Sequence, residues 1–212
     1  MFTFILIFFG STLVSFLGSV QLGPVNIFVI NTALFTGKRE ALLIAIGGIL
    51  PEFIYCSLAV FATSYILQFD WIIPVFEITF IAVFVVIAIL FFIKKPINVS
   101  LNKNEISKQS NFLLVSKGFM LAILNPQLLP FWVFVQVYFN QISFLNVKTM
   151  LDKTSYVLGA GIGAFVLLNF FIYFSHKHRE KVLSYVNNSY YFKVLSVLFF
   201  TVAVYQLWKY FN

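Results

Sequence analysis

The first 37 residues of the chain contain no charged side chain. A continuous helix of that length would extend about 55 Å at ~1.5 Å per residue, whereas about 20 apolar residues are enough to cross a bilayer. Gly23 and Pro24 interrupt the stretch near its middle. Proline cannot continue a helix without a kink, and glycine allows the backbone to change direction sharply. We therefore predict a first membrane span over residues 3–36 that is broken at 23–24, with a second half-helix starting at Pro24.

The composition is typical of a membrane protein rather than a soluble one. Hydrophobic residues make up 61% of the 212 residues and charged residues only 10%, against about 25% charged in soluble domains. The net charge of +7 would suit a nucleic-acid partner in a soluble protein. Here the basic residues lie in short loops, where they act as orientation signals. We therefore expect the lipid bilayer, and no nucleic acid, as a partner.

Apolar segments separated by polar turns predict six membrane spans. The spans cover residues 3–36, 41–67, 71–93, 112–140, 153–175 and 189–211. The fourth span contains a second break, at Asn125 and Pro126, in the position that matches the break of the first.

The chain divides into two halves of similar design. A polar linker over 94–111 separates residues 1–93 from residues 112–212 within a single membrane domain. Each half has a broken span, then a glycine-rich span, then a plainer third span. Because three spans is an odd number, the second copy would be inverted in the membrane, as in many secondary transporters. The predicted fold is an all-α polytopic membrane protein of six transmembrane helices, built as two inverted three-helix repeats with a broken first helix in each.

Basic residues are distributed unequally between the two sides that six spans define. Eleven lie on one side, namely Lys38, Arg39, Lys94, Lys95, Lys103, Lys108, Lys117, Lys177, Arg179, Lys181 and Lys193. Three lie on the other, namely Lys148, Lys153 and Lys209. The richer side is expected to be cytoplasmic, which would place both termini outside. No basic segment precedes the first apolar run, so no cleavable signal peptide is expected.

The two breaks predict a binding site at mid-membrane. A half-helix that starts there presents free backbone N–H groups and the positive end of its dipole, which suit an anion such as a substrate carboxylate. Asn125 could also cap the half-helix that starts at Pro126. A proline can simply kink a membrane helix. Two matched breaks, each beside an amide side chain (Asn26 and Gln127), favour a transporter site instead.

Glu52 is the most informative single residue, because it lies deep inside the second predicted span. An acid at that depth is costly and usually faces a cavity or a partner. It could hold a substrate ammonium group or carry a coupling proton. The alternative is a protonated carboxyl group hydrogen-bonded between helices. Gln21 and Gln136 could likewise line a cavity or hold helices together.

The predicted substrate-binding residues come from both breaks and from the second span: Gly23, Pro24, Asn26, Glu52, Asn125, Pro126 and Gln127. Glu52 is also predicted to carry the coupling proton. Glycines in the second and fifth spans are predicted to allow close helix packing: Gly47, Gly48, Gly159 and Gly163. No catalytic residue, cofactor or metal is predicted, because His176 and His178 lie in a basic surface loop and Glu52 is the only deep acid.

The breaks and the deep acid resemble the signatures of the lysine exporter (LysE/RhtB) family of bacterial amino-acid exporters. Those signatures are a Pro-Gly-Pro followed by a Gly and a basic residue, a glycine-rich span ending in an acid, and a Gly-Phe followed by Asn-Pro-Lys. They are matched here by Leu22-Gly23-Pro24 with Gly37-Lys38, by Gly47-Gly48 with Glu52, and by Gly118-Phe119 with Asn125-Pro126-Gln127. The resemblance covers essentially the whole chain. This chain departs from the signatures at three positions. Leu22 replaces the first Pro, Glu52 replaces the usual Asp, and Gln127 replaces the usual Lys.

The resemblance implies a six-span protein in the inner (plasma) membrane of a bacterium. It would export an amino acid or an amino-acid derivative, driven by a proton gradient or by the membrane potential, without acting as an enzyme. A homodimer is a possible assembly. Because Gln127 removes a cation from the predicted site, the resemblance does not name the substrate. An exporter of a different small solute or cation, or a non-transporting membrane scaffold, is the alternative.

Overall fold

The computed structural model describes residues 3–20, 23–66, 72–93, 109–125, 127–178, 180 and 189–211. These residues form eight helices, with no strand among them. Gln21, Leu22, Pro126 and most of the predicted linker lie outside the described residues. The all-helical prediction is confirmed for the part of the chain that is described. The chain separates into two compact parts, which are treated one at a time.

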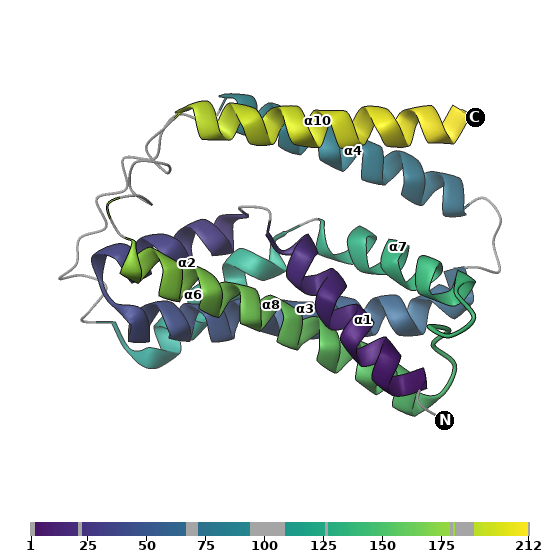
Figure 1. The fold of residues 1–212 in the computed structure, drawn as a ribbon, viewed down its shortest axis with the longest axis horizontal. Helices are drawn as coiled ribbons and strands as arrows, with labels where there is room; N and C mark the ends of the chain where they lie inside the picture. The colour runs from purple at the N-terminus through teal and green to yellow at the C-terminus, as the bar shows by residue number, and fades with distance from the viewer. Residues whose placement is uncertain are drawn as a thin grey trace. The chain divides into compact units, whose positions relative to one another are not determined.

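The larger part comprises residues 1–63 and 100–179. Its helices are α1 (Thr3–Gly18), α2 (Pro24–Phe35), α3 (Lys38–Ile66), α6 (Asn111–Ile123), α7 (Leu128–Gln141) and α8 (Met150–Lys177). α8 packs against both α1 and α2, and the crossing of α1 with α8 is visible in Figure 1. The first half of the chain therefore packs against the second.

The smaller part comprises residues 64–99 and 180–212. Its two helices, α4 (Ile72–Ile93) and α10 (Ser189–Phe211), lie side by side (Figure 1). Ser196 Oγ of α10 donates a hydrogen bond to the backbone oxygen of Ala88 in α4 at 2.7 Å. These helices belong to the third and sixth predicted spans.

Both predicted breaks are present as interruptions between helices. α1 ends at Gly18 and α2 begins at Pro24, which occupies the first turn of the helix where a missing N–H costs nothing. α6 ends at Ile123 and α7 begins at Leu128, and the two helices are bent by 64° relative to one another. The second break thus begins at Leu124, one residue before the predicted Asn125.

Among the residues described, two helices are by themselves long and apolar enough to cross a membrane. They are Lys38–Thr63 within α3 and Met150–Lys177, which is α8. The bent pair of α6 and α7 makes a third when it is counted as one span. α1 and α2 are apolar but shorter, as the halves of a broken span must be.

α6 packs on α3 at very short range. A side chain at Gly47 of α3 would collide with the backbone oxygen of Val115 and the backbone nitrogen of Phe119. In return, a side chain at Gly118 of α6 would collide with the backbone oxygen of Ile44. Only glycine allows two helix backbones to approach so closely. The predicted role of Gly47 in helix packing is confirmed.

α1 packs on α8 in the same way. A side chain at Gly163 of α8 would collide with the backbone oxygen of Thr12 and the backbone nitrogen of Phe16. Ser15 of α1 donates its hydroxyl to the backbone oxygen of Ala160 at 2.6 Å. Gly163 therefore also has its predicted packing role.

The two interfaces correspond residue by residue. Each sets a glycine of a long helix against the oxygen of one residue and the nitrogen of the residue four positions later on a half-helix. The residues of α1 and α6 pair at one constant separation along the chain. The pairs are Thr12 with Val115, Ser15 with Gly118, and Phe16 with Phe119. Four buried positions of α2 and α7 pair at the same separation. The pairs are Val29 with Trp132, Ile30 with Val133, Thr32 with Val135, and Ala33 with Gln136. We call this correspondence the contact register.

Large apolar side chains are exposed along one face of α1. They are Leu6, Phe9, Leu13 and Leu17, three or four residues apart. This spacing places them on one side of the helix. A continuous apolar face of this kind suits contact with lipid rather than water.

Candidate functional site

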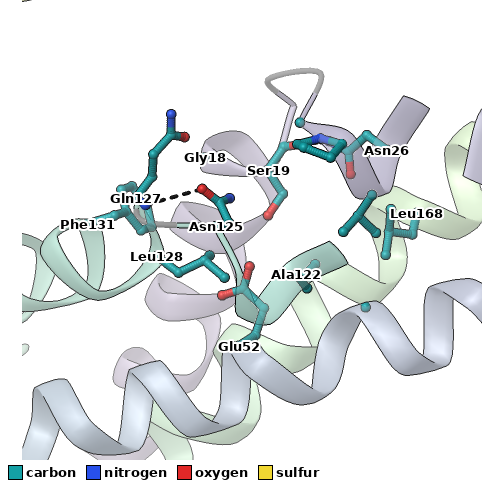
Figure 2. A pocket seen from close by; sticks show the side chains of 15 residues that line it. Gly18, Ser19, Asn26, Glu52, Ala122, Asn125, Gln127, Leu128, Phe131 and Leu168 are labelled. Carbon is teal, nitrogen blue, oxygen red and sulfur yellow. Dashed lines mark hydrogen bonds between the residues drawn. The ribbon is translucent and has the colours of Figure 1, made fainter. Parts of the chain in front are cut away.

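One cavity lies where the two breaks of the larger part meet (Figure 2). Its volume is about 80 Å³, which leaves room for several water molecules at the roughly 10–15 Å³ that each requires. All six helices of the larger part contribute to its wall. The lining residues are Gly18, Ser19, Gly23, Pro24, Val25, Asn26, Gly48, Glu52, Ala122, Asn125, Gln127, Leu128, Phe131, Ala164 and Leu168.

The first break is closed by a side chain from α2. Gly23 is the N-terminal cap residue of α2, with an extended backbone (φ −68°, ψ 172°) and no side-chain cap. Asn26 Nδ2 donates to the backbone oxygen of Ser19 at 2.7 Å. This bond supplies a donor to a carbonyl that the end of α1 leaves without a helical partner. Asn26 therefore holds the two half-helices together across the break.

The second break is stabilised from both sides. Asn125 Oδ1 accepts a hydrogen bond from the backbone N–H of Gln127 at 3.2 Å. Tyr55 of α3 donates its hydroxyl to the backbone oxygen of Ile123, at the end of α6, at 2.6 Å. Gln127 is the cap residue of α7, which begins at Leu128. The predicted cap by Asn125 therefore acts on the residue before the helix rather than on a helix starting at Pro126.

Glu52 projects from the middle of α3 toward the cavity. Figure 2 shows its carboxylate pointing at the space beside Asn125 and Ser19, while the Gln127 side chain extends away from it. The residue is only 8% exposed. Its Oε2 accepts a hydrogen bond from Trp132 Nε1 of α7 at 2.6 Å. The carboxylate thus faces a cavity and is also hydrogen-bonded between helices.

Trp132 is fixed in place by its neighbours on α8. The indole is fully buried, and its ring meets the Tyr156 ring edge-on, with centroids 5.5 Å apart. The Tyr156 hydroxyl donates to the backbone oxygen of Trp132 at 3.4 Å. Such edge-to-face aromatic contacts have a defined geometry. The N–H that Trp132 offers to Glu52 therefore has a defined direction.

The family of the chain follows from a match that covers nearly all of it. A family model described as LysE type translocator matches residues 16–209. The chain belongs to the LysE translocator family. No curated protein and no solved structure matches it. The resemblance stated from the sequence is therefore confirmed.

This LysE-type translocator is a multi-pass membrane protein that transports small solutes, because that is what proteins of its family do. Family members are transporters rather than enzymes. The apolar helices and the exposed apolar face of α1 agree with a location in lipid.

The translocator brings six of its seven predicted substrate-binding residues to the wall of one cavity: Gly23, Pro24, Asn26, Glu52, Asn125 and Gln127. The seventh, Pro126, and the candidate Gln21 lie outside the described residues. Gln136 does not line the cavity and is buried further along α7. The part these residues play in binding remains a prediction.

Several residues at the site were not predicted from the sequence. Trp132 binds Glu52 across 80 residues of chain, and Tyr55 supports α6 from one turn past Glu52. Trp132 lies one helical turn before Gln136, so a search for polar side chains on one face of α7 would have found it. The apolar wall formed by Phe131 and Leu168 carries no such signal.

The charge of the translocator's cavity comes from one side chain. Glu52 is the only ionisable residue among the described residues that line it. No three His, Cys, Asp or Glu side chains of the described chain lie close enough together to hold a metal ion. The backbone at the starts of α2 and α7 provides the opposite polarity, because a helix N-terminus carries a partial positive charge. The site therefore offers one negative group and two weakly positive helix ends.

Proposed function

We propose that the protein exports a zwitterionic amino acid, or a close derivative, and that the cavity between the two breaks is its substrate site. The observation that supports this most is that both breaks and Glu52 line one cavity. A broken helix leaves backbone groups unsatisfied in the membrane, which is tolerated where those groups line a cavity. Paired breaks at mid-membrane are the arrangement that secondary transporters use to bind small polar substrates.

The chemistry of the wall fits the two ends of an amino acid. The substrate carboxylate would lie at the helix starts around Gly23 and Gln127, where backbone N–H groups and dipoles favour an anion. The ammonium group would pair with Glu52. Leu128, Phe131 and Leu168 would face the side chain. With glutamine at position 127, the wall has no fixed cation to bind a second substrate acid.

Glu52 would also couple transport to protons. A carboxylate that binds the ammonium group must release it on the far side, and taking up a proton would favour that release. In this cycle Glu52 carries substrate in one direction and a proton in the other. The bond from Trp132 would keep the carboxylate aimed at the cavity in either state.

The matched interfaces support the proposed inverted repeat. α6 contacts α3, and α1 contacts α8, through equivalent residues in the contact register. Such reciprocal contacts are expected when two similar three-helix units are related by an approximate two-fold axis. α4 and α10, with 22 and 23 residues, would provide the third span of each unit. Alternating access would then come from rocking one unit against the other.

The orientation proposed from the charges places the basic loops in the cytoplasm and both termini outside. In a bacterium the membrane concerned is the plasma membrane. The α2–α3 turn would face the cytoplasm, and the loop between α7 and α8 would face outward. Export would then move substrate from the side rich in basic residues to the other.

The test is counterflow of labelled amino acids in proteoliposomes, with and without an imposed pH gradient. We expect saturable exchange of one or a few neutral amino acids by the wild type, accelerated by the gradient. Glu52→Gln should abolish both exchange and acceleration, because it removes the ammonium partner and the proton carrier together. Glu180→Gln, at an exposed acid, is the matched control and should behave as wild type.

Two outcomes would count against this proposal. Normal gradient-driven transport by folded Glu52→Gln would remove Glu52 from the mechanism. Failure of the wild type to exchange any amino acid would move the substrate to another solute or cation, or would favour a scaffold without transport.

A further inference from the structure

The side chain of Gln136 in α7 is buried and only half-satisfied. It is 2% exposed, and its Nε2 donates to Asn140 Oδ1 at 3.4 Å. Its Oε1 has no hydrogen-bond partner among the described residues. Asn140 Oδ1 also accepts the backbone N–H of Val147 at 3.2 Å, which fixes the orientation of the Asn140 amide. Exchanging the oxygen and nitrogen of the Gln136 amide would therefore place Gln136 Oε1 against Asn140 Oδ1, two acceptors with no hydrogen between them. A buried amide oxygen without a donor is costly, and a bound water molecule is the usual remedy.

Two hydroxyls of α2 differ from Gln136 in this respect. Thr32 Oγ1 and Thr36 Oγ1 are also buried without a partner in the described part of the chain. A threonine hydroxyl in a helix can rotate and donate to the carbonyl one turn earlier, as Thr63 does to Ala59 at 2.6 Å. An amide oxygen can only accept, and the helix interior has no spare N–H to offer. Gln136 is therefore the position that needs water.

Gln136 stands in a row of polar groups along one face of α7. Trp132, Gln136 and Asn140 are spaced four residues apart, so one turn, or about 5.4 Å, separates each from the next. The row begins at Glu52, which accepts the Trp132 N–H. It ends at Asn140, which is partly exposed and whose backbone oxygen accepts from Asn146 Nδ2 at 3.3 Å. The row therefore leads from the cavity acid to the loop between α7 and α8.

The equivalent face of α2 is apolar. In the contact register, Val29 and Ala33 take the places of Trp132 and Gln136. Both belong to a buried apolar cluster that also contains Leu168 of α8. Water along that face would find no polar side chain at either position. At these paired positions the two halves of the protein differ, because α7 has polar side chains where α2 has apolar ones.

We propose that the row of Trp132, Gln136 and Asn140 holds water and conducts protons between Glu52 and the α7–α8 loop. This rests on the proposed role of Glu52 as the proton carrier. A proton from the solution at the loop passes from water to water and is added to the Glu52 carboxylate, and release follows the same route in reverse. Gln136 neither gains nor loses a proton. Its Oε1 accepts a hydrogen bond from one water and holds it between the turns of α7.

The groups around Glu52 leave the carboxylate as the acceptor at the inner end of the row. Cys56, one turn later on α3, is buried, and Tyr156 of α8 uses its hydroxyl to bind Trp132 O. Thiols and phenols are ordinarily much weaker acids than a carboxyl group. No Lys, Arg or His lies among the described lining residues of the cavity. Under the proposed orientation the loop faces outward, so the row would bring the returning proton to Glu52.

The first test detects the water itself and needs no substrate. Radiolytic hydroxyl-radical labelling modifies buried aromatic rings that lie beside bound water. Trp132 and Tyr156 are fully buried and should nevertheless be labelled in the purified wild type. Gln136→Met, which keeps the length of the side chain and removes its polar end, should lower that labelling several-fold. Thr32→Val is the matched control, because it removes a buried hydroxyl from α2, and it should leave the labelling unchanged.

The second test separates proton coupling from substrate movement. Exchange of labelled amino acid without a gradient does not require a proton to cross, whereas acceleration by a pH gradient does. Gln136→Met should keep exchange close to wild type and lower the gradient-driven rate by roughly tenfold or more, as expected for loss of a proton-transfer step. Asn140→Leu should do the same and serves if Gln136→Met does not fold.

The outcomes distinguish the water row from the transport proposal. Equal labelling in wild type and Gln136→Met would overturn the row whatever the substrate is. Unchanged gradient-driven transport in folded Gln136→Met would overturn it as well, as would an equal loss of exchange and of gradient-driven transport. Absence of exchange by the wild type, together with the expected fall in labelling, would contradict the amino-acid proposal and leave the water site supported.

Discussion

Among the described residues, the carboxylate of Glu52 accepts one hydrogen bond, and its donor comes from another helix. A polar group buried in the membrane is costly without a hydrogen-bond partner, and a buried charge is costlier still. The indole N–H of Trp132 meets that need at Oε2 without adding a second charge to the cavity. A lysine or arginine in that place would form an ion pair with Glu52 and would oppose the exchange of a substrate ammonium for a proton that we propose for it.

Replacing Trp132 by phenylalanine tests this arrangement. Trp132→Phe keeps an aromatic ring near Tyr156 but removes the N–H, so a buried acceptor loses its donor. We expect the free energy of unfolding to fall by about 1–3 kcal/mol and the KM for substrate to rise, because the carboxylate is no longer aimed. Thermal unfolding in detergent and exchange kinetics would measure both. Unchanged stability and an unchanged KM in Trp132→Phe would contradict the role given to Trp132.

At this scale the sequence identified Glu52 and missed its partner for a physical reason. An acid in an apolar run is visible because it breaks the composition of its surroundings. A tryptophan in a membrane protein is expected at the lipid–water interface. The position of Trp132 one turn before Gln136 indicates a shared helix face, but it does not indicate a partner 80 residues away in the chain. Gln136 was visible as a polar residue, but the face of α7 on which it lies was not.

The broken spans require their own hydrogen-bond partners. Each half-helix that ends in the membrane leaves carbonyl groups without an N–H one turn ahead. Asn26 serves Ser19 at the end of α1, and Tyr55 serves Ile123 at the end of α6. One donor thus comes from across the break and the other from a neighbouring helix. The breaks were predictable from Gly23 and Pro24, whereas the donor Tyr55 belongs to another span and was not.

Tyr55→Phe should loosen the second break. The variant removes the hydroxyl that binds the Ile123 oxygen at 2.6 Å and keeps the ring. We expect the free energy of unfolding to fall by about 1 kcal/mol. Transport should also be slower, because the end of α6 beside the cavity is no longer held by this hydrogen bond. Unfolding curves and exchange rates would show it. Tyr65→Phe, at an exposed ring on α3, is the control, and an effect of the same size there would mean that the Ile123 bond is not the cause.

The glycine contacts make a sharper prediction about stability. Gly47→Ala places a methyl group against the Val115 carbonyl, and helix backbones cannot yield as side chains can. We expect the free energy of unfolding to fall by about 1–3 kcal/mol, measured as a lower unfolding temperature in detergent. A side chain at Gly23 would meet nothing within 4 Å and the φ there is an ordinary negative one, so Gly23→Ala should lose less stability, limited to the poorer N-cap that alanine makes. Similar losses in both variants would show that close packing is not what Gly47 provides.

For the molecule as a whole, the proposed inversion places equivalent turns on opposite sides of the membrane. Lys38, the first residue of α3, and the loop before α8 would occupy matching places in the two halves. With Cys56 replaced by serine, Lys148→Cys should react with a membrane-impermeant maleimide added outside intact cells. Lys38→Cys should react only after permeabilisation. Both residues are exposed, so burial would not explain a difference; labelling of both from the same side would rule out the inverted repeat.

The relation between the halves was only partly visible in the sequence. Broken and glycine-rich spans in the same order suggested a repeat, but the side chains have diverged, with Ser15 matching Gly118 and Val29 matching Trp132. The contacts preserve what the residue types do not, because backbone proximity depends on small size at a few positions. The second break illustrates the limit, since α6 ends at Ile123, three residues before Pro126.

The reciprocal glycine contacts also bear on ancestry. A two-fold interface between identical subunits contains every contact twice, and here α3 meets α6 as α8 meets α1. If the proposed inverted repeat is correct, a lone three-helix unit with these two surfaces would bury them against a second copy of opposite orientation. The chain would then correspond to an antiparallel homodimer joined into one polypeptide, with Leu168 at the position that matches Glu52 in the other half. Halves expressed as separate chains, 1–93 and 109–212, should still find one another in the membrane.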